Sequence, residues 1–170
     1  LRLPSGKMSS RTGDVITAEW LIEEAKKRIK EKMADSDVSD KEKVAEEIAI
    51  GAIKYSILKH TLGSDIIFDF DASLSFEGDS GPYLQYTHAR ARSVVEKAKE
   101  SGIKPSLSGK SDTTEEIERM LYQFPEVVSR ADTERAPHFV TTYLIELAQS
   151  FNNFYAKERI ADSPYRLALT

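Results

Sequence analysis

The fold is decided by the stretch Glu77–Ser93, which reads EGDSGPYLQYTHARARS. Its glycines allow backbone conformations that are closed to other residues. Asp79 or Ser80 can accept hydrogen bonds from the free N–H groups at the start of a helix. Pro82 suits the first helical turn, where its missing N–H costs nothing. The stretch therefore predicts a loop that continues as a helix.

The predicted helix has two different faces. Apolar residues recur at helical spacing and predict its buried side: Leu84, Ala91, Val95 and Ala98. A second stripe combines aromatic, hydroxyl and cationic side chains: Tyr83, Tyr86, Arg90, Ser93 and Lys97. Aromatic rings beside cations can stack unpaired bases and hold phosphates. Such a stripe can equally pack against a neighbouring helix, with the tyrosine hydroxyls hydrogen-bonded.

The sequence of residues 75–90 resembles the segment that opens the anticodon-binding domain of arginyl-tRNA synthetases, S-F-E-G-N-T-G-P-Y-L-Q-Y-x-H-A-R. Asp79 and Ser80 stand in place of the usual Asn and Thr. The resemblance extends over nearly all 170 residues. It implies a mainly α fold, in which residues 1–75 are the end of a class I catalytic domain with stem-contact helices. Residues 76–170 are then an incomplete anticodon-binding helical bundle.

Composition narrows the class of protein. The chain has 170 residues, a net charge of −4, no cysteine and three histidines, so a disulfide framework, a thiolate metal site and a zinc site are not expected. Nothing resembles a signal peptide or a membrane span. Each side of Ser75 holds 12 basic and 14 acidic residues, which argues weakly against a bulk nucleic-acid binder. We expect a cytoplasmic monomer that binds no metal and no membrane.

A polar loop follows the first residues of the chain, with the sequence PSGKMSSRTG at positions 4–13. Its cations and hydroxyls can surround a polyphosphate, although composition alone equally fits an ordinary surface loop. The loop resembles the K-M-S-K-S signature of class I aminoacyl-tRNA synthetases. Lys7, Met8 and Ser9 match it, Ser10 stands where the second Lys is usual, and Arg11 follows. Whether Arg11 takes over the missing charge is open.

The resemblance assigns roles to this loop. It implies that ATP is bound by Lys7, Met8 and Ser9, and that Lys7, Ser9, Ser10 and Arg11 assist catalysis by stabilising charge on the departing pyrophosphate. ATP and Mg²⁺ are then expected in the parent enzyme, which joins arginine to its tRNA through an aminoacyl-adenylate. None is expected to bind to this chain alone.

Helical periodicity organises the first half of the chain. A helix capped by Thr17 is predicted to about Met33, and its core face is formed by Trp20, Leu21, Ala25 and Ile29. A second helix, capped by Asp40 and running to about His60, is apolar around much of its circumference and is expected to be buried on more than one side. Residues 66–71 predict a short extended segment, with Asp69 and Asp71 as structural caps, Asp71 for the next turn.

The second half also predicts helices. One starts at Thr113 or Thr114 and runs to Gln123, Pro125 then opens a short separate helix to about Ala131, and a longer helix starts at Ala136. The core stripe of the longer helix is formed by Val140, Leu144, Leu147, Phe151 and Phe154. A last helix is expected at residues 164–169. Since the chain begins without Met and ends inside a predicted helix, we expect a fragment of a longer protein. The resemblance implies that the H-I-G-H signature and the arginine pocket lie before Leu1, so the fragment is expected to be inactive by itself.

The resemblance also implies the residues that contact tRNA. The run Phe151–Tyr155 is similar to the F-N-x-F-Y of the same anticodon-binding domain. The expected tRNA-binding residues are Tyr83, Gln85, Tyr86, His88, Arg90, Asn152 and Tyr155, with arginine tRNA as the partner. Gln85 and His88 can instead hold the helix in its bundle. An alternative is a helical tRNA-binding or purely structural module without catalysis, and a third hypothesis is a class I lysyl enzyme, which also uses K-M-S-S.

Overall fold

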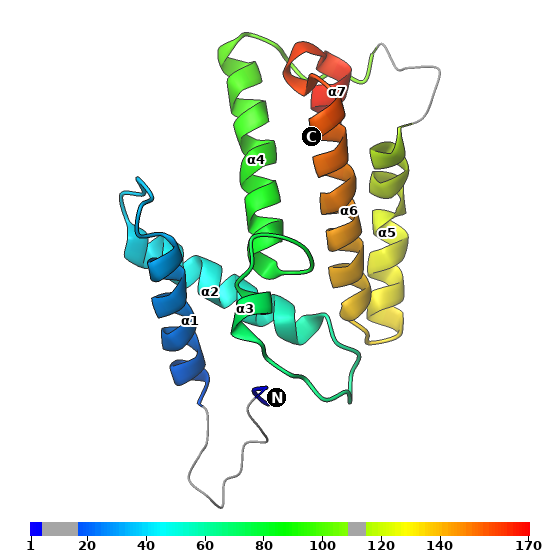
Figure 1. Cartoon of the computed structure of the whole chain (residues 1–170). Helices are drawn as coiled ribbons and strands as arrows, with labels where there is room; N and C mark the ends of the chain where they lie inside the picture. Colours follow the sequence, from blue (N-terminus) through cyan, green and yellow to red (C-terminus); the bar gives the residue numbers. More distant parts are fainter. Residues whose placement is uncertain (5–16, 109–114) are drawn as a thin grey trace, which may run out of the picture. The chain divides into compact units, whose positions relative to one another are not determined.

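The protein is mainly helical in a computed structural model, which describes residues 1–4, 17–108 and 115–170 (Figure 1). The mainly α fold expected from the sequence is confirmed. The chain divides into two compact units, Leu1–Gln85 and Tyr86–Thr170. The signature-like residues 7–11 lie outside the described residues.

The first unit is built on α1 (Ala18–Lys32) and α2 (Lys41–Leu58), which pack against each other. The hydroxyl of Thr17 accepts a hydrogen bond from the Trp20 N–H at 3.1 Å, and the Asp40 carboxylate accepts one from the Lys43 N–H at 3.0 Å. Both predicted caps are therefore confirmed. Each satisfies an N–H group that has no partner within its helix.

The core of the first unit is formed by α1, α2 and the segment that follows them. Its buried members are Leu21, Ala25, Ile29, Met33, Ala45, Ala49, Ala52, Phe68, Phe70 and Leu74. Trp20 was expected on the core face of α1, and this is wrong, because its side chain is 45% exposed. It lies in the first turn of α1, and its ring packs edge to face with the Phe70 ring, with centroids 6.2 Å apart.

A short extended segment crosses this core. Arg2 and Ile67 form a parallel bridge, in which the Arg2 N–H donates to the Ile66 carbonyl at 2.8 Å. The segment ends earlier than expected, because α3 (Phe70–Ser73) begins at Phe70. The prediction that Asp71 caps the next turn is wrong. The capping role expected of Asp69 is confirmed, because its carboxylate accepts a hydrogen bond from the Ala72 N–H at 3.0 Å.

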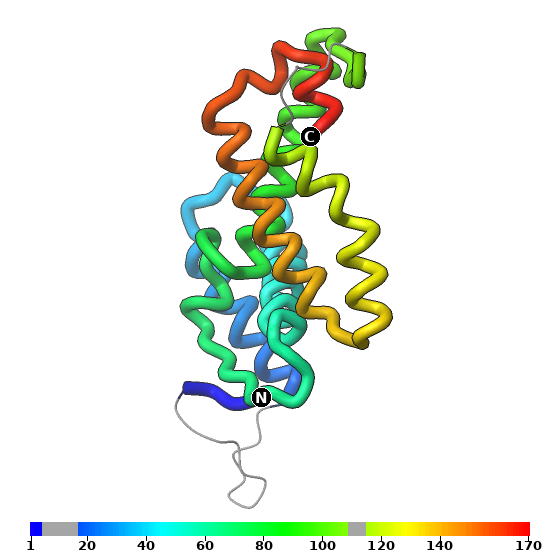
Figure 2. Tube along the Cα trace, turned by 90° about the vertical axis from the view of Figure 1, so that its right-hand side faces the viewer, coloured from blue at the N-terminus to red at the C-terminus, as the bar shows by residue number. Residues whose placement is uncertain are grey.

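The second unit contains most of α4 (Gly81–Glu100), followed by α5 (Glu116–Thr133), α6 (His138–Lys157), the 3₁₀ helix η1 (Ile160–Asp162) and α7 (Pro164–Ala168). α5 and α6 lie side by side as a helical hairpin (Figures 1 and 2). Its turn includes Arg135, whose φ is 51°. The buried core gathers residues from every one of these helices: Val94, Ala98, Ile117, Phe151, Phe154, Ile160, Tyr165, Leu167 and Leu169.

α5 contradicts the expected break at Pro125. The helix is continuous through the proline, although a proline removes one backbone hydrogen bond and crowds the preceding turn. Packing against α6 holds the helix together here. The Tyr143 hydroxyl donates to the Met120 carbonyl at 2.9 Å, and the Tyr143 and Phe124 ring centroids lie 5.6 Å apart. Tertiary contacts therefore outweigh the local preference.

α6 confirms only part of its predicted core stripe. Phe151 and Phe154 are buried, whereas Val140, Leu144 and Leu147 are half-buried. Further buried side chains widen the stripe: Thr141, Tyr143, Ile145, Ala148 and Ser150. α7 confirms the last predicted helix, and Ser163 caps it by accepting a hydrogen bond from the Arg166 N–H.

Candidate nucleic-acid interface

The loop that opens α4 is fixed by its own hydrogen bonds. Of the two caps expected, Asp79 or Ser80, the structure has Ser80. Its hydroxyl oxygen accepts a hydrogen bond from the Tyr83 N–H at 3.2 Å. The same hydroxyl donates to the Ser75 carbonyl at 2.5 Å. Gly78 has a φ of 76°, a left-handed conformation in which a side chain would be strained.

Close packing brings the start of α4 against α2 within the first unit. A Cβ atom added to Gly81 would lie 2.6 Å from the Gly51 carbonyl oxygen and 2.8 Å from the Ala52 Cα. Gly81 is therefore needed for a close approach of two backbones. The amide of Gln85 lies over Gly51 and donates to the Glu47 carbonyl at 3.1 Å.

A polar cluster at the end of α2 holds the same loop. The Tyr55 hydroxyl donates to the Asp79 carboxylate, and the Lys59 ammonium lies 3.0 Å from the other carboxylate oxygen. Burial raises the pKa of Tyr55, and so does its hydrogen bond to Asp79. Burial opposes the charge on Asp79, but the hydrogen bonds from Tyr55 and Lys59 outweigh it and lower the pKa of Asp79.

The second polar cluster lies wholly within the second unit and is centred on Arg90. Its guanidinium donates to the Asn152 side-chain oxygen at 2.7 Å and to the Tyr86 hydroxyl. The guanidinium carbon stands over the rings of Tyr86 and Tyr155, at 4.6 and 5.0 Å from their centroids. Asn152 also donates to the Thr87 hydroxyl at 2.9 Å. The cluster therefore ties α4 to α6 while both tyrosine rings stay accessible, with Tyr86 45% and Tyr155 42% exposed.

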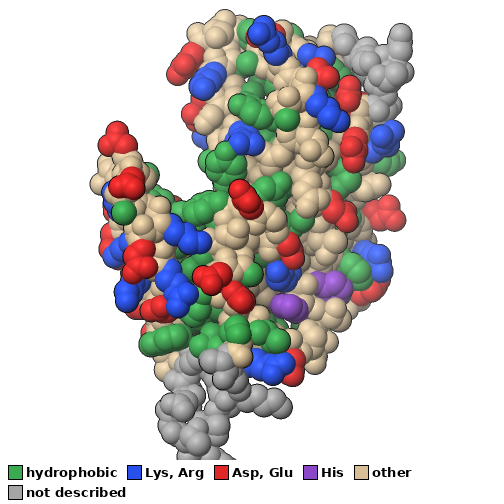
Figure 3. All heavy atoms as spheres, in the orientation of Figure 1, with side chains coloured by type: hydrophobic (Ala, Val, Ile, Leu, Met, Phe, Trp, Pro, Cys, Tyr) green, Lys and Arg blue, Asp and Glu red, His purple; other side chains and the backbone are tan. Residues whose placement is uncertain are grey.

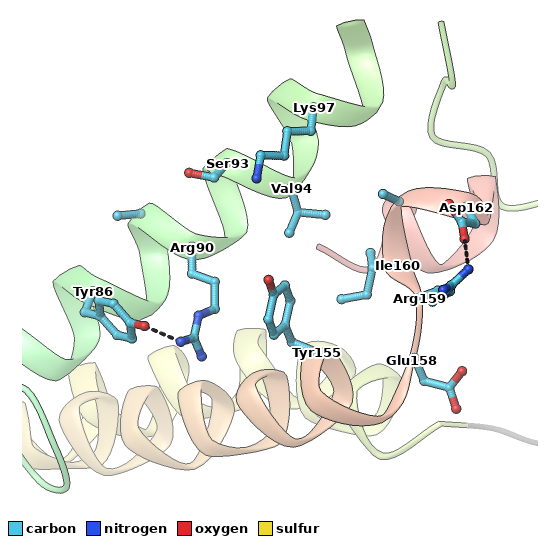
Figure 4. A pocket seen from close by; sticks show the side chains of 12 residues that line it. Tyr86, Arg90, Ser93, Val94, Lys97, Tyr155, Glu158, Arg159, Ile160 and Asp162 are labelled. Atoms are coloured by element: carbon cyan, nitrogen blue, oxygen red, sulfur yellow. Dashed lines mark hydrogen bonds and ion pairs between the residues drawn. The ribbon is translucent and has the colours of Figure 1, made fainter. Parts of the chain in front are cut away.

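This cluster forms one end of a pocket of about 700 Å³ (Figure 4). α4 supplies one wall and the end of α6 with η1 supplies the other. The lining residues are Tyr86, Ala89, Arg90, Ser93, Val94, Lys97, Tyr155, Glu158, Arg159, Ile160, Ala161 and Asp162. Val94 and Ile160 give it an apolar floor, and the tyrosines give it aromatic faces.

The pocket collects only some of the tRNA-contacting residues expected from the sequence. Tyr86, Arg90 and Tyr155 line it, and Asn152 is bonded to Arg90 behind it. Tyr83 is half-buried, Gln85 packs on Gly51 in the first unit and His88 is exposed; none of these three lines the pocket. Ser93 and Lys97 belong to the predicted stripe and do line it.

Residues 158–162 were missed by the sequence reasoning. They follow the last predicted turn of α6, where no periodic pattern continues, so nothing local placed them beside α4. The burial of Ile160 turns this segment back onto the helix and brings Glu158, Arg159 and Asp162 to the pocket. An apolar residue amid charged neighbours in the run ERIAD was the available signal.

Among the residues that the structure describes, no group of three or more His, Cys, Asp or Glu side chains is arranged to hold a metal ion. No helix within the described ranges is long and apolar enough to span a membrane.

Comparison with known families gives two matches that follow each other along the chain. Residues 4–70 match the catalytic domain of class I tRNA synthetases of the arginine type, described as "tRNA synthetases class I (R), catalytic domain". Residues 84–169, half of the chain, match the DALR anticodon binding domain. The helical unit with the Arg90 cluster is thus of the class of DALR anticodon-binding domains.

Individual relatives agree with these matches. An arginine–tRNA ligase of Ignicoccus hospitalis is 35% identical over 96% of this chain, and one of Streptococcus pneumoniae is 40% identical over 94%. The solved structure of Thermus thermophilus arginyl-tRNA synthetase superposes with a TM-score of 0.82 at 35% identity, over 99% of this chain. The chain belongs to the arginyl-tRNA synthetase family. It spans 26–30% of the length of these three proteins.

Proposed function

We propose that this chain supplies the tRNA-recognising part of an arginine–tRNA ligase, together with its ATP-contacting signature loop. The observation that carries the proposal is the pair of exposed tyrosine rings held on either side of Arg90 in a DALR domain. Accessible aromatic rings provide faces on which unpaired bases stack, and a stacked guanidinium adds positive charge for the phosphates.

The residues of the site divide by role. Tyr86, Arg90 and Tyr155 are proposed to contact the anticodon loop directly, because they line the pocket. Asn152 is proposed as a positioning residue, since its oxygen and its nitrogen are already bonded to Arg90 and Thr87. Gln85 is proposed to hold α4 on α2 in the first unit rather than to touch RNA, because its amide packs on Gly51. Tyr83 and His88 remain proposed tRNA contacts outside the pocket.

The parent reaction is proposed to be the ATP-dependent joining of arginine to its tRNA through an adenylate, in the cytoplasm. Its supports are the class I catalytic-domain match over residues 4–70 and the ligase names of the relatives. Lys7, Ser9, Ser10 and Arg11 are proposed to stabilise charge developing on pyrophosphate, and Met8 to contact ATP. We place the end of the catalytic part at residues 1–75 and the anticodon-binding part at 76–170.

The signature loop is tested by Lys7→Ala in a full-length parent enzyme. Removing one positioned cation is expected to slow adenylate formation about 10²- to 10³-fold, by analogy with the loss of a single charge-stabilising donor. The affinity for tRNA should stay nearly unchanged. A loss of tRNA binding alone would remove Lys7 from the chemistry. This chain by itself should show no arginine-dependent exchange of pyrophosphate with ATP.

The recognition module is tested by fluorescence anisotropy of this chain with arginine tRNA and with a version substituted at the central anticodon base. Tighter binding of the natural anticodon, persisting as salt is raised, is the expected result. Equal and strongly salt-dependent binding of both would mean phosphate attraction only. Absence of binding would favour the alternative of a purely structural module, which the net charge of −4 supports.

A further inference from the structure

The charges around the pocket are unevenly compensated (Figure 4). Two carboxylates line it, and each has an arginine partner: Glu158 lies 2.5 Å from the Arg166 guanidinium, and Asp162 lies 3.7 Å from that of Arg159. The cations on the α4 wall, Arg90 and Lys97, differ from these carboxylates because neither has an oppositely charged partner among the described residues. Arg90 is bonded to the neutral side chains of Tyr86 and Asn152. Among the described residues, none forms an ion pair or a hydrogen bond with the Lys97 ammonium.

The pocket therefore carries excess positive charge along α4. Arg90 and Lys97 are seven residues apart on one helix, so their Cα atoms are separated by two turns, about 10 Å along the axis. Figure 4 shows the Lys97 side chain extending back along α4 toward Ser93, which places its ammonium on the same wall as Arg90. The Ser93 hydroxyl lies between these cations in sequence and is exposed.

We propose that Lys97 binds a backbone phosphate of the single-stranded RNA whose base occupies this pocket. This phosphate is a different one from the phosphate that lies nearest to Arg90. The proposal rests on the proposed tRNA-binding function and adds a residue that the signature motifs do not assign. Arg159 and Arg166 act indirectly, because they neutralise the carboxylates that would otherwise repel the strand. An ammonium is a point charge without a fixed fork, which suits sequence-independent contact with phosphate.

The test compares Lys97→Met with Lys99→Met. Both lysines lie in the last turns of α4 and both changes lower the net charge by one, but only Lys97 lines the pocket. Binding of this chain to arginine tRNA, and to its version with a substituted central anticodon base, is measured by anisotropy from 50 mM to 400 mM salt. Thermal melting by circular dichroism checks that each variant is folded.

Loss of one phosphate contact should reduce the slope of log K against log salt by about 0.7. The affinity lost at 50 mM salt should therefore be about fourfold greater than the affinity lost at 400 mM. The loss should be equal for both RNAs, since phosphates carry no sequence information. Lys99→Met should change neither quantity by more than a small fraction of this. Equal effects of the two variants, or no effect of Lys97→Met, would overturn the proposal.

The two functions fail in different ways. Equal binding of both RNAs by the wild-type chain, together with a selective effect of Lys97→Met, would remove anticodon recognition and leave the phosphate contact standing. A clear anticodon preference with an unaltered salt slope in Lys97→Met would do the reverse. Absence of binding to either RNA by the wild-type chain would overturn both.

Discussion

The polar cluster at the end of α2 and the cluster centred on Arg90 each join a tyrosine hydroxyl to a charged partner. They differ in the exposure of the tyrosine to solvent. Tyr55 is 6% exposed and its hydroxyl holds the Asp79 carboxylate beside Lys59. Tyr86 is 45% exposed, and its hydroxyl accepts a hydrogen bond from Arg90 at the side of a pocket. In the first cluster the Tyr55 ring is buried by packing. In the second, the Tyr86 ring and the positive charge of Arg90 are available to a ligand.

The difference teaches that a charged partner does not make a tyrosine a binding residue. In the first cluster the carboxylate is paired with an ammonium, so its net charge is compensated, and the hydroxyl is engaged. In the second, the Arg90 guanidinium donates hydrogen bonds to two neutral side chains, those of Asn152 and Tyr86. Exposure together with uncompensated charge therefore distinguishes the proposed site, and neither property can be read from residue types alone.

The largest effect is expected from Gly81→Ala, at the start of α4, next to the loop that Tyr55 and Lys59 hold through Asp79. The new Cβ would lie 2.6 Å from the Gly51 carbonyl oxygen, a backbone atom that cannot swing aside. Overpacking of this kind should lower the free energy of unfolding by an amount at the upper end of roughly 1–3 kcal/mol. Denaturant unfolding followed by fluorescence of Trp20, the single tryptophan of the chain, reports on the first unit.

Gly78→Ala is the matched control for that experiment. Nothing lies within 4 Å of a Cβ at Gly78, so its cost is only the strain of a left-handed backbone, about 1–2 kcal/mol. A Gly81→Ala variant as stable as Gly78→Ala would show that the two helices separate easily. The close approach would then not be what holds the start of α4.

The second-largest effect is expected from Tyr86→Ala in the cluster centred on Arg90. Loss of a base-stacking ring should weaken tRNA binding by roughly 1–3 kcal/mol, while the thermal melting of the chain, followed by circular dichroism, stays nearly unchanged. Anisotropy with arginine tRNA measures the change. Tyr122→Ala is the control, since Tyr122 is 88% exposed on α5 and does not line the pocket. If Tyr86→Ala mainly unfolds the chain, the comparison fails and Tyr86 is a packing residue.

A smaller effect is expected from Tyr55→Phe. Deleting the hydroxyl leaves the Asp79 carboxylate with Lys59 but without its nearly buried donor, which should lower the unfolding free energy by about 1–2 kcal/mol. The pKa of Tyr55 is raised in the fold, so its stabilisation is present below its ordinary pKa of about 10 and declines above it. This alkaline decline of the Trp20 transition should be weaker in Tyr55→Phe.

Tyr143→Phe separates that result from a general cost of losing a hydroxyl. Tyr143 is also buried and donates to the Met120 carbonyl, but in the second unit. It should leave the Trp20-reported transition unchanged. A shift of equal size in both variants would mean that Trp20 does not report on the first unit alone.

Local chemistry made much of the fold predictable. The caps at Thr17, Asp40 and Ser80 follow from side chains that accept hydrogen bonds from free N–H groups, and the structure has all three. The continuous α5 was not predictable from its own sequence, because the helix continues through Pro125 where it packs on α6. Trp20 likewise fitted a core stripe by spacing, while its exposure depends on what lies opposite the first turn.

The site was predictable only in part for the same reason. The spacing of Tyr86, Arg90 and Lys97 on one helix face is a property of the sequence. Their meeting with Tyr155 and with residues 158–162 depends on tertiary contacts between α4 and the end of α6. The family resemblance supplied Tyr155, but no pattern indicated that Asp162 and Glu158 would be neutralised by separate arginines.

The smallest effect tests whether the charge on Asp79 contributes to the unfolding free energy of the first unit. Its pKa is lowered in the fold, so its stabilisation is fully present above the unfolded pKa, near 3.8, and is lost as pH falls further. Its side chain is 60% exposed, so solvent screening limits the effect to below about 1 kcal/mol. The Trp20 transition should therefore weaken more between pH 4 and pH 2.5 in the wild-type chain than in Asp79→Asn. Other carboxylates titrate in both proteins and cancel in the difference. Parallel curves would show that the Tyr55 hydrogen bond, which an amide oxygen also accepts, holds the loop without the charge.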